Sequence, residues 1–403
     1  MPDNAAIDQI RLFQQELTQI RHDIHAHPEI GFEERRTSEL VAAKLREWDV
    51  EVTEGVGLTG VVGTIRGSRS GLRSIGLRAD MDALPIQERT GLSYASRTDG
   101  KMHACGHDGH TTLLLGAARY LSQHRDFAGT VHFIFQPAEE GLGGASAMLN
   151  DRLFERFPCD AVYGLHTGPG LAAGMFATMP GPLMAGVGRF EVTFRGTGGH
   201  GGLSPSSTTD LTIVQAEYVL ALQAFVESEV PSHETAGIRF GYIAGGQHTA
   251  FAVMPSELTV GGTTRVFTLE VQELLERRVE ELAHSLASEH GATADVKLWR
   301  ISPPLINSVE QTRIAVEAAQ AVAGIEKVIA TGKRVNAGED FAFMLEARPG
   351  AFIFLGNGAA PDGSYHSIHT PQYDFNDEVI PTGVAFWVSL VQRQLNPDKI
   401  TNL

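Results

Sequence analysis

The chain is poor in cysteine and in positive charge, and each shortage excludes a class of protein. Only Cys105 and Cys159 occur among 403 residues, so no disulfide framework holds the fold together. Lysine and arginine number 32 against 48 aspartate and glutamate residues, which gives a formal net charge of -16. Because such an acidic balance repels phosphate backbones, we expect no nucleic acid among the partners.

Long apolar runs are also missing. No stretch approaches the roughly 18 consecutive apolar residues that cross a bilayer, so we expect no membrane partner. The N-terminal residues predict an amphipathic helix with Ile7, Ile10, Leu17 and Ile24 on one face. This segment lacks the basic start and apolar centre of a signal peptide, and we therefore predict a cytoplasmic protein.

Short apolar runs alternate with helical patterns before residue 186. The runs that predict strands are 50–52, 60–65, 74–77, 130–135 and 161–165. Strands that alternate with helices favour an α/β fold with a largely parallel sheet. In such sheets ligands gather at the carboxyl ends of the strands, where this chain places polar clusters.

From about Gly186 the order of elements changes. The pattern predicts a strand, a helix, two strands, a helix and a strand, at 190–194, 210–227, 238–243, 257–266, 269–290 and 294–299. This β-α-β-β-α-β order is typical of a ferredoxin-like domain. We therefore predict one α/β domain of residues 1–185 and 298–403, interrupted by an inserted ferredoxin-like domain of residues 186–297.

The densest chemical signal is the segment MHACGHDGHTT, which precedes an apolar helical pattern. It contains five polar groups of metal-ligand type, His103, Cys105, His107, Asp108 and His110. Imidazole, thiolate and carboxylate are the ligands of zinc and of metals with similar preferences. The alternative is a polar helix cap with solvated histidines.

The segment FIFQPAEEG places two adjacent carboxylates, Glu139 and Glu140, directly after an apolar strand. One can bind a metal while the other takes a proton from activated water. The alternative is a pair of solvated loop glutamates, which is the commoner fate of an isolated Glu-Glu pair.

Further candidates follow other strands or lie in glycine-rich and proline-flanked loops. They are Asp80 and Asp82 in RADMDALP, His166 in YGLHTGP, His200 in GTGGHGG, and His366 and His369 in SYHSIHTPQ. A carboxylate in such a place either binds a metal or orients a ligand histidine through its second nitrogen. A lone loop histidine such as His200 is more often a surface residue.

Three other chemistries have weaker support. A zinc deaminase requires Pro-Cys-x-x-Cys, and neither Cys105 nor Cys159 has a second cysteine within reach. A Cys105 nucleophile would leave the Glu139 and Glu140 pair unexplained. The sequence also lacks the GxxxxGK[ST] loop of nucleotide phosphoryl transfer.

Taken together, the motifs resemble those of the M20 metallopeptidase family. The segments LRADMDALP, MHACGHDGHT, QPAEEG, GLHTGP, GGH and a late His-Thr-Pro occur in the same order and at similar separations. The resemblance is greatest to the amidohydrolase branch, which includes hippurate hydrolases, aminoacylases and indole-acetyl-amino-acid hydrolases. It runs from His22 to about Asp377 and so covers nearly the whole chain.

The resemblance implies a two-metal catalytic domain and an inserted lid that also forms the dimer, giving a homodimer or a higher oligomer. It implies two divalent ions per subunit, zinc or manganese, with cobalt or nickel as alternatives. The implied ligands are Cys105, His107, Glu140, His166 and His369, with the Cys105 thiolate bridging the metals.

The remaining roles also follow from the resemblance. Glu139 would be the general base, and Asp80 the carboxylate that orients a ligand. His200 would reach the partner subunit's active site and polarise the scissile carbonyl, and Arg265 would grip the substrate carboxylate.

Two positions depart from the family pattern, because Ala252 replaces a usual asparagine and Ser206 a common histidine. We predict a hydrolase that cleaves the amide bond of N-acyl amino acids. Three alternatives stay open: the same chemistry on a small amide without a carboxylate, a dipeptidase or carboxypeptidase, and an inactive relative that acts as a binding module.

Overall fold

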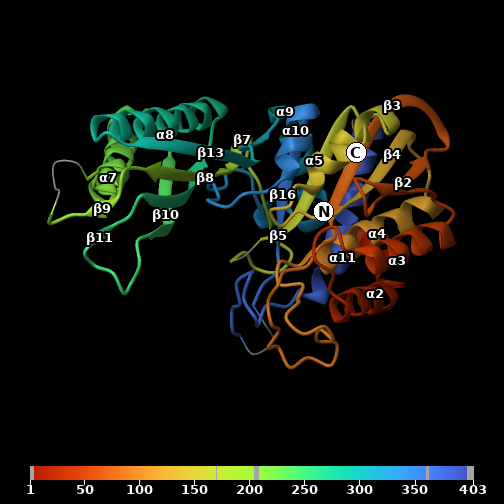
Figure 1. Cartoon of the computed structure of the whole chain (residues 1–403). Helices are drawn as coiled ribbons and strands as arrows, with labels where there is room; N and C mark the ends of the chain where they lie inside the picture. The colour runs from red at the N-terminus through yellow and green to blue at the C-terminus, as the bar shows by residue number, and fades with distance from the viewer. Residues whose placement is uncertain (1–3, 169, 204–207, 360–362, 397–403) are drawn as a thin grey trace. The chain divides into compact units, whose positions relative to one another are not determined.

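The computed structural model describes residues 4–168, 170–203, 208–359 and 363–396, and the chain forms two compact units (Figure 1). The first unit consists of Met1–Leu183, Ile306–Lys333 and Asp340–Leu403. The second consists of Met184–Leu305 and Arg334–Glu339, and it contains the predicted insert of residues 186–297.

The first unit is built on an eight-stranded sheet with the order β1-β2-β4-β3-β5-β16-β6-β15. The strands are β1 (Glu51–Val56), β2 (Gly60–Arg66), β3 (Arg69–Asp80), β4 (Ala128–Gln136), β5 (Ala161–Gly168), β6 (Phe176–Ala177), β15 (Val328–Ile329) and β16 (Gly350–Gly356). The central strands β4, β3, β5 and β16 run parallel, and antiparallel pairs occur at β1/β2, β2/β4 and β6/β16. The α/β fold with a largely parallel sheet is confirmed.

Helices accompany this sheet, and most of them pack on it through one large apolar core. They are α1 (Asn4–Arg11), α2 (Gln14–Ala26), α3 (Arg35–Glu47), α4 (His107–Gln123), α5 (Gly144–Asn150), α6 (Leu153–Arg156), α9 (Val309–Ala323), α10 (Phe341–Ala347) and α11 (Ile380–Leu395), with short 3-10 turns η1 (Ile325–Lys327) and η2 (Asp377–Val379). The apolar runs within the central strands fit this arrangement, because residues on both faces of a central strand are buried. Strand β5 is buried along its whole length.

The single N-terminal helix expected from the sequence is two helices. The chain turns at Leu12 and Phe13, where their backbone N–H groups bond to Gln9 and Ile10. The predicted apolar face is kept, since Ile10, Leu17 and Ile24 are all fully buried.

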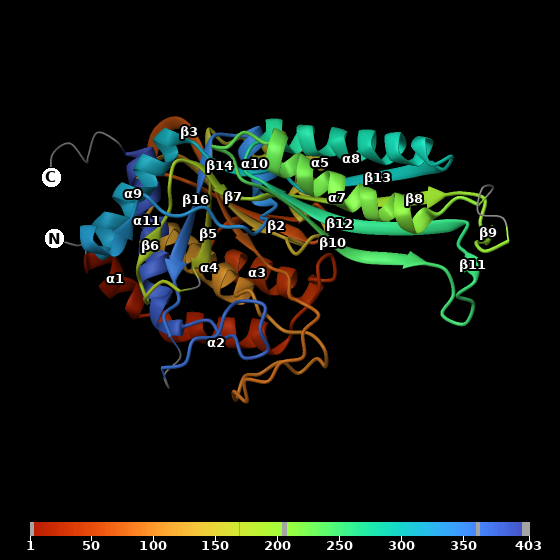
Figure 2. The same cartoon turned by 90° about the vertical axis from the view of Figure 1, so that its left-hand side faces the viewer.

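The second unit has a four-stranded antiparallel sheet with the order β10-β12-β8-β13. Its elements are β8 (Gly186–Arg195), β9 (Gly199–His200), α7 (Leu211–Glu229), β10 (Ala236–Gly245), β11 (Val253–Met254), β12 (Glu257–Val266), α8 (Leu269–Glu289) and β13 (Thr293–Ser302). Helices α7 and α8 lie against one face of this sheet and enclose a core with alternate strand residues such as Phe190, Val192 and Phe194 (Figure 2). This is the β-α-β-β-α-β order expected from the sequence.

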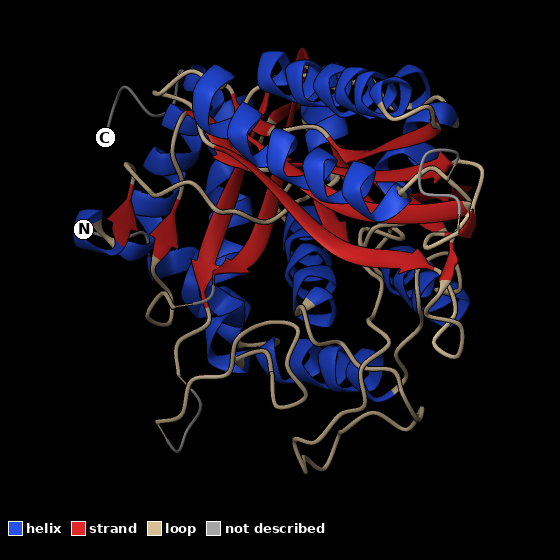
Figure 3. Cartoon of the chain, turned by 60° about the vertical axis from the view of Figure 1, so that its left-hand side comes forward, coloured by secondary structure: helices blue, strands red, loops and turns tan. Residues whose placement is uncertain are grey.

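Two short strand pairs complete the structure. β9 pairs with β11 in the second unit, and β7 (Gly181–Met184) pairs with β14 (Leu305–Asn307) where the chain passes between the units. Figure 3 shows helices and strands in separate colours. Among the described residues, no helix is both long enough and apolar enough to span a membrane.

Candidate metal centre

The carboxyl ends of three parallel strands carry the candidate site. Asp80 is the last residue of β3, Gln136 is the last residue of β4, and His166 lies near the end of β5. Asp80 and Gln136 are direct neighbours in the strand register. Helix α4 starts at His107 beside these ends, so the topology itself gathers the polar segments.

Cys105, Glu140 and His369 form the first potential ligand group. Their ligand atoms all lie within 4.8 Å of one another. His369 Nε2 lies 3.3 Å from Cys105 Sγ and 3.2 Å from Glu140 Oε1. Three segments that are far apart in the sequence therefore present a thiol, a carboxylate and an imidazole to one point.

His107 and His166 belong to a second group, together with Asp80 and His110. The ligand atoms of these four buried residues also lie within 4.8 Å of one another. The two groups adjoin each other, because Cys105 Sγ lies 3.5 Å from His166 Nε2 and His107 Nε2 lies 4.0 Å from Glu140 Oε1. Cys105 thus stands between the two groups.

The residues present fit a bound cation. Within the described part of the chain, the buried His107 Nε2 has no hydrogen-bond partner, and the nearest carboxylate oxygens lie 3.8 Å and 4.0 Å away. Buried polar atoms are normally satisfied, so this imidazole nitrogen among carboxylates indicates a missing ligand. A set of thiol, imidazole and carboxylate donors suits zinc and related divalent metals.

The electrostatics of the site favour positive charge. Burial alone would lower the pKa of His107, but the carboxylates of Asp80, Asp82 and Glu140 raise it to about 10. Burial, followed by the nearby Glu140 and Glu139 carboxylates, raises the pKa of the Cys105 thiol well above its usual value. The carboxylates that contribute to both raised pKa values also attract a divalent cation, whose binding would release the protons of the ligand groups.

Asp82 contacts one member of each ligand group. Its Oδ1 lies 3.2 Å from His107 Nδ1, and its Oδ2 accepts the backbone N–H of Glu140 at 3.0 Å. A carboxylate that binds the second nitrogen of a histidine fixes the ring and its tautomer. The sequence singled out Asp82 as a carboxylate but did not reveal this partner.

Asp80, predicted to orient a ligand, contacts His110 and Arg78 most closely. Its Oδ1 lies 2.7 Å from His110 Nδ1, and its Oδ2 accepts a hydrogen bond from Arg78 at 2.6 Å. The same Oδ2 lies 3.8 Å from His107 Nε2. Asp80 therefore borders the second group while Arg78 balances its charge.

Arg78 is the centre of a buried network that the motifs did not reveal. Its guanidinium donates to Gln136 Oε1 at 2.9 Å and approaches Asp340 Oδ1 at 3.5 Å. Gln136 donates to the same Asp340 oxygen at 2.6 Å, and the other oxygen of Asp340 accepts the Ala145 N–H at 2.9 Å. These contacts hold both ends of the loop that carries Glu139 and Glu140.

Other histidines and acids of the dense motif have different surroundings. Asp108 Oδ2 lies 2.8 Å from His25 Nδ1 and accepts from the buried Arg21, so it faces helix α2. His103 is buried near His25, with ring centroids 6.3 Å apart. His366 contacts Ser364 and lies in none of the clustered groups of the described residues.

Two residues at the site have backbone conformations that side chains rarely adopt. Ala138, before Glu139, has φ +52°, and His369 has φ +63°. At Gly106, between Cys105 and His107, φ is +93° and a Cβ would lie 2.7 Å from Tyr373 Oη. Only glycine fits there, which explains how ligands two residues apart can share one centre.

His200 and Arg265 lie in the second unit. The ring nitrogen Nδ1 of His200 accepts the backbone N–H groups of Gly202 and Leu203 at 3.2 Å each. Arg265 is half-buried in β12, and Nη1 donates to the Thr264 carbonyl at 2.9 Å. Ala252 is exposed just before β11, and Ser206 lies outside the described residues.

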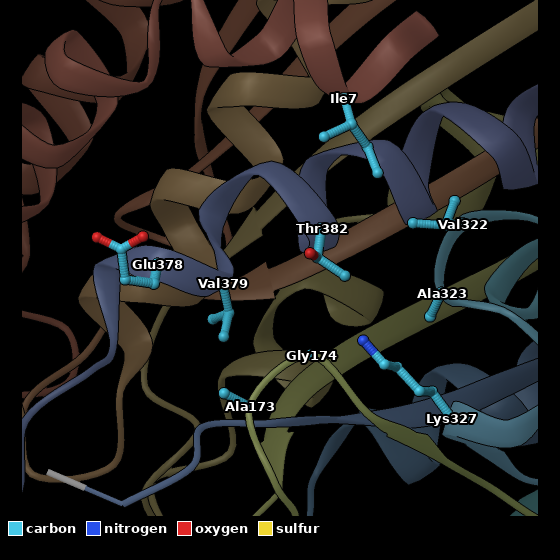
Figure 4. A pocket seen from close by; sticks show the side chains of 9 residues that line it. All are labelled: Ile7, Ala173, Gly174, Val322, Ala323, Lys327, Glu378, Val379 and Thr382. Atoms are coloured by element: carbon cyan, nitrogen blue, oxygen red, sulfur yellow. The ribbon is translucent and has the colours of Figure 1, made fainter. Parts of the chain in front are cut away.

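A separate cavity of about 290 Å³ lies elsewhere in the first unit, where Lys327 and Thr382 face it from opposite walls (Figure 4). Its lining residues are Ile7, Ala173, Gly174, Val322, Ala323, Lys327, Glu378, Val379 and Thr382. None of them belongs to the clustered groups of the described residues, so this cavity is distinct from the candidate metal centre.

Comparison with known proteins gives consistent matches along the chain. The model of peptidase family M20/M25/M40 matches residues 76–393. Hippurate hydrolase of Campylobacter jejuni is 37% identical over 389 residues, which cover 96% of this chain and 99% of that protein. N-acetylcysteine deacetylase of Bacillus subtilis is 35% identical over 382 residues, covering 94% of this chain and 97% of the relative.

A solved structure agrees with these matches. The Bacillus subtilis YXEP protein, described as a dinuclear metal binding peptidase from the M20 family, superposes with a TM-score of 0.82 at 32% identity. The match covers 96% of this chain and 99% of that structure.

Proposed function

Because the chain belongs to peptidase family M20/M25/M40, we propose that it is a metal-dependent amidohydrolase that cleaves N-acyl amino acids. Hippurate hydrolase and N-acetylcysteine deacetylase, both more than 30% identical over nearly the whole chain, support this substrate class. The observation that carries the proposal is the pair of adjoining ligand groups that meet at Cys105.

Two divalent ions would be held by five residues. Cys105, Glu140 and His369 would hold one ion, and Cys105, His107 and His166 the other. The thiol favours zinc, and the imidazole and carboxylate donors also accommodate manganese, cobalt or nickel. Bound there, such ions would polarise the scissile carbonyl and lower the pKa of the attacking water.

Glu139 would move the proton. It lies beside Glu140 and His107, with ligand atoms of the three within 4.8 Å of one another. A carboxylate at this place can accept a proton from the attacking water and return it to the leaving amine. We assign Glu139 this role and Glu140 the role of ligand. Asp80 would keep the second group in place through His110.

His200 would stabilise charge on the carbonyl oxygen. Since its Nδ1 accepts two backbone N–H groups, the neutral ring carries its hydrogen on Nε2, which can donate to a developing oxyanion. Its action on a neighbouring active site requires paired subunits, and we propose a homodimer or higher oligomer. The cytoplasm stays the predicted location.

Arg265 would recognise the substrate carboxylate. Although burial lowers its pKa, a guanidinium stays charged at neutral pH and binds a carboxylate with two parallel hydrogen bonds. Arg265→Ala should raise KM for N-acyl amino acids about 10- to 100-fold, as expected for a lost charged hydrogen bond. Arg195→Ala, on the neighbouring strand β8, is the matched control and should leave KM unchanged.

The main test is release of free amine from a panel of N-acyl amino acids, each paired with the same amide lacking its carboxylate. The protein is loaded with manganese or zinc, and dipeptides are included. We expect hydrolysis of the carboxylated members. Glu139→Gln should keep both metals and lose turnover, whereas Glu140→Gln should lose metal. A fully metal-loaded protein that cleaves no member of the panel would contradict the proposal and favour a binding module.

Ala252 favours a second candidate function. The family usually has an asparagine here, and its replacement removes a polar group that would help to hold the substrate. The pocket would then accept small amides that lack an amino-acid carboxylate. In that case the decarboxylated members of the panel are cleaved, and Arg265→Ala does not affect their KM.

A further inference from the structure

Glu34 is a fully buried carboxylate that belongs to neither ligand group. It stands directly before helix α3 without capping it through its side chain, and both of its side-chain oxygens are hydrogen-bonded elsewhere. Oε1 accepts the backbone N–H of Ala138 at 2.8 Å, and Oε2 accepts the Thr59 hydroxyl at 2.6 Å. The first bond joins Glu34 to the residue directly before Glu139.

Hydrogen bonds hold the backbone on both sides of Glu139. The N–H of Ala138 donates to Glu34, and its carbonyl accepts the Gly144 N–H at 3.0 Å. The N–H of Glu140 donates to Asp82 Oδ2 at 3.0 Å. Two carboxylates from separate segments thus fix the backbone around Glu139.

Ala138 needs this support because of its backbone conformation. Its φ of +52° is unfavourable for any residue with a Cβ, and such conformations persist only where the surroundings hold them. Glycine would adopt the same φ without cost, but it would also leave the loop freer to move. An alanine tied to a buried carboxylate gives one defined conformation instead.

The segment that carries Glu34 packs directly against this loop. A Cβ on Gly31 would lie 2.9 Å from Ala138 Cα, so only glycine permits this close approach. The same segment also reaches the Asp82 loop, since the Ala83 N–H donates to the Glu29 carbonyl at 2.8 Å. One short stretch of chain therefore connects both carboxylates that hold the peptides around Glu139.

We propose that Glu34 is a positioning residue for Glu139, acting through the Ala138 peptide. This inference rests on the proposed function, in which Glu139 is the general base. Glu34 lies outside both ligand groups and would act through the backbone N–H of Ala138. Its task is to keep the Glu139 side chain in reach of the attacking water, because a displacement of about 1 Å can cost 100-fold in rate.

The test compares three variants of the metal-loaded protein. Glu34→Ala removes the acceptor, and we expect kcat to fall about 10- to 100-fold, with KM within about twofold and the metal content unchanged. In Glu34→Gln the amide oxygen can accept from Ala138 while its NH₂ donates to Thr59, so most of kcat should return. Thr59→Val removes only the other bond to Glu34 and should keep wild-type kcat.

A second measurement does not depend on activity. Hydrogen exchange of the loop at 137–141 should speed up in Glu34→Ala and stay as in the wild type in Glu34→Gln and Thr59→Val. Unchanged kcat and exchange in Glu34→Ala would overturn the proposal. Loss of metal, or a Glu34→Gln variant no better than Glu34→Ala, would also overturn it. A wild-type protein that is silent on every amide refutes the proposed function, and the exchange rates then decide whether Glu34 holds the loop.

Discussion

Asp82 and His107 form a buried pair in which Asp82 Oδ1 lies 3.2 Å from His107 Nδ1. Since the other oxygen of Asp82 accepts the Glu140 N–H, one carboxylate supports a ligand from each group. The geometry of the two groups is therefore coupled through a residue that lies behind both.

Asp82→Asn should weaken metal binding about 10- to 100-fold, because the amide cannot accept from His107 and from Glu140 at the same time. Competition with a chromogenic chelator measures this affinity. Asp99→Asn, at an exposed position of the 83–102 loop, serves as the control. Equal affinities of Asp82→Asn and the wild type would show that His107 does not depend on Asp82.

Cys105→Ser should remove the sulfur-to-metal charge-transfer band of the cobalt-loaded protein. Cys105 Sγ lies within 3.5 Å of both His166 Nε2 and His369 Nε2, so we expect the thiolate to bind the metal directly. Absorption spectra in the near ultraviolet test this. Cys159→Ser should keep the band, since Cys159 donates to the Phe157 carbonyl instead. A band that persists in Cys105→Ser would exclude the thiolate as a ligand.

Arg21→Met should lower the free energy of unfolding by about 3–5 kcal/mol, because it leaves buried acids without a counter-charge. Arg21 is fully buried and lies 2.8 Å from Asp377, 2.9 Å from Asp374 and 3.4 Å from Asp108. Urea denaturation of the metal-free protein measures the change. Arg11→Met, at an exposed position, should change stability by less than about 0.5 kcal/mol. Similar losses in the two variants would argue against a structural role for this cluster.

His132 should make the protein less stable in mild acid. Burial, with added repulsion from Arg66, lowers its pKa to about 4, against roughly 6.5 in an unfolded chain. As pH falls from about 6.5 to 4, His132 becomes protonated in the unfolded state but stays neutral in the folded state. The free energy of unfolding therefore decreases over this range. The loss amounts to up to about 3 kcal/mol.

Urea unfolding at pH 7 and pH 4.5 tests this prediction with His132→Gln. The stability advantage of the wild type over the variant should shrink at the lower pH. His233→Gln, which removes an exposed histidine, should differ from the wild type by the same amount at both pH values. An advantage of the wild type that does not change with pH would contradict a neutral buried His132.

The sequence predicted the strands of the large sheet where apolar runs were long enough. β2, β4 and β5 coincide with such runs, because their residues are buried on both faces. The pattern did not reveal the turn at Leu12 and Phe13, where no glycine or proline marks the break. Strands of two residues, such as β6 and β15, are too short to show any period.

The candidate site was predicted where ligand-type residues are concentrated along the chain. Cys105, His107 and Glu140 stand in dense motifs, and the structure gathers them with His369 and His166. Contacts between residues that only the tertiary fold brings together could not be predicted from such motifs. Glu34, Asp340 and the pairing of Asp82 with His107 depend on contacts between segments up to 262 residues apart. The roles of His200 and Arg265 stay predictions.

The distance along the chain between Cys105 and His369 has a consequence for protein synthesis. These residues meet at 3.3 Å although 264 positions separate them. At a translation rate of about 5–20 residues per second, His369 is synthesised more than roughly ten seconds after Cys105. During that interval Cys105 and Glu140 are present in the nascent chain without the third member of their group, His369. A group that needs both Cys105 and His369 can therefore be completed only after nearly the whole chain has been synthesised.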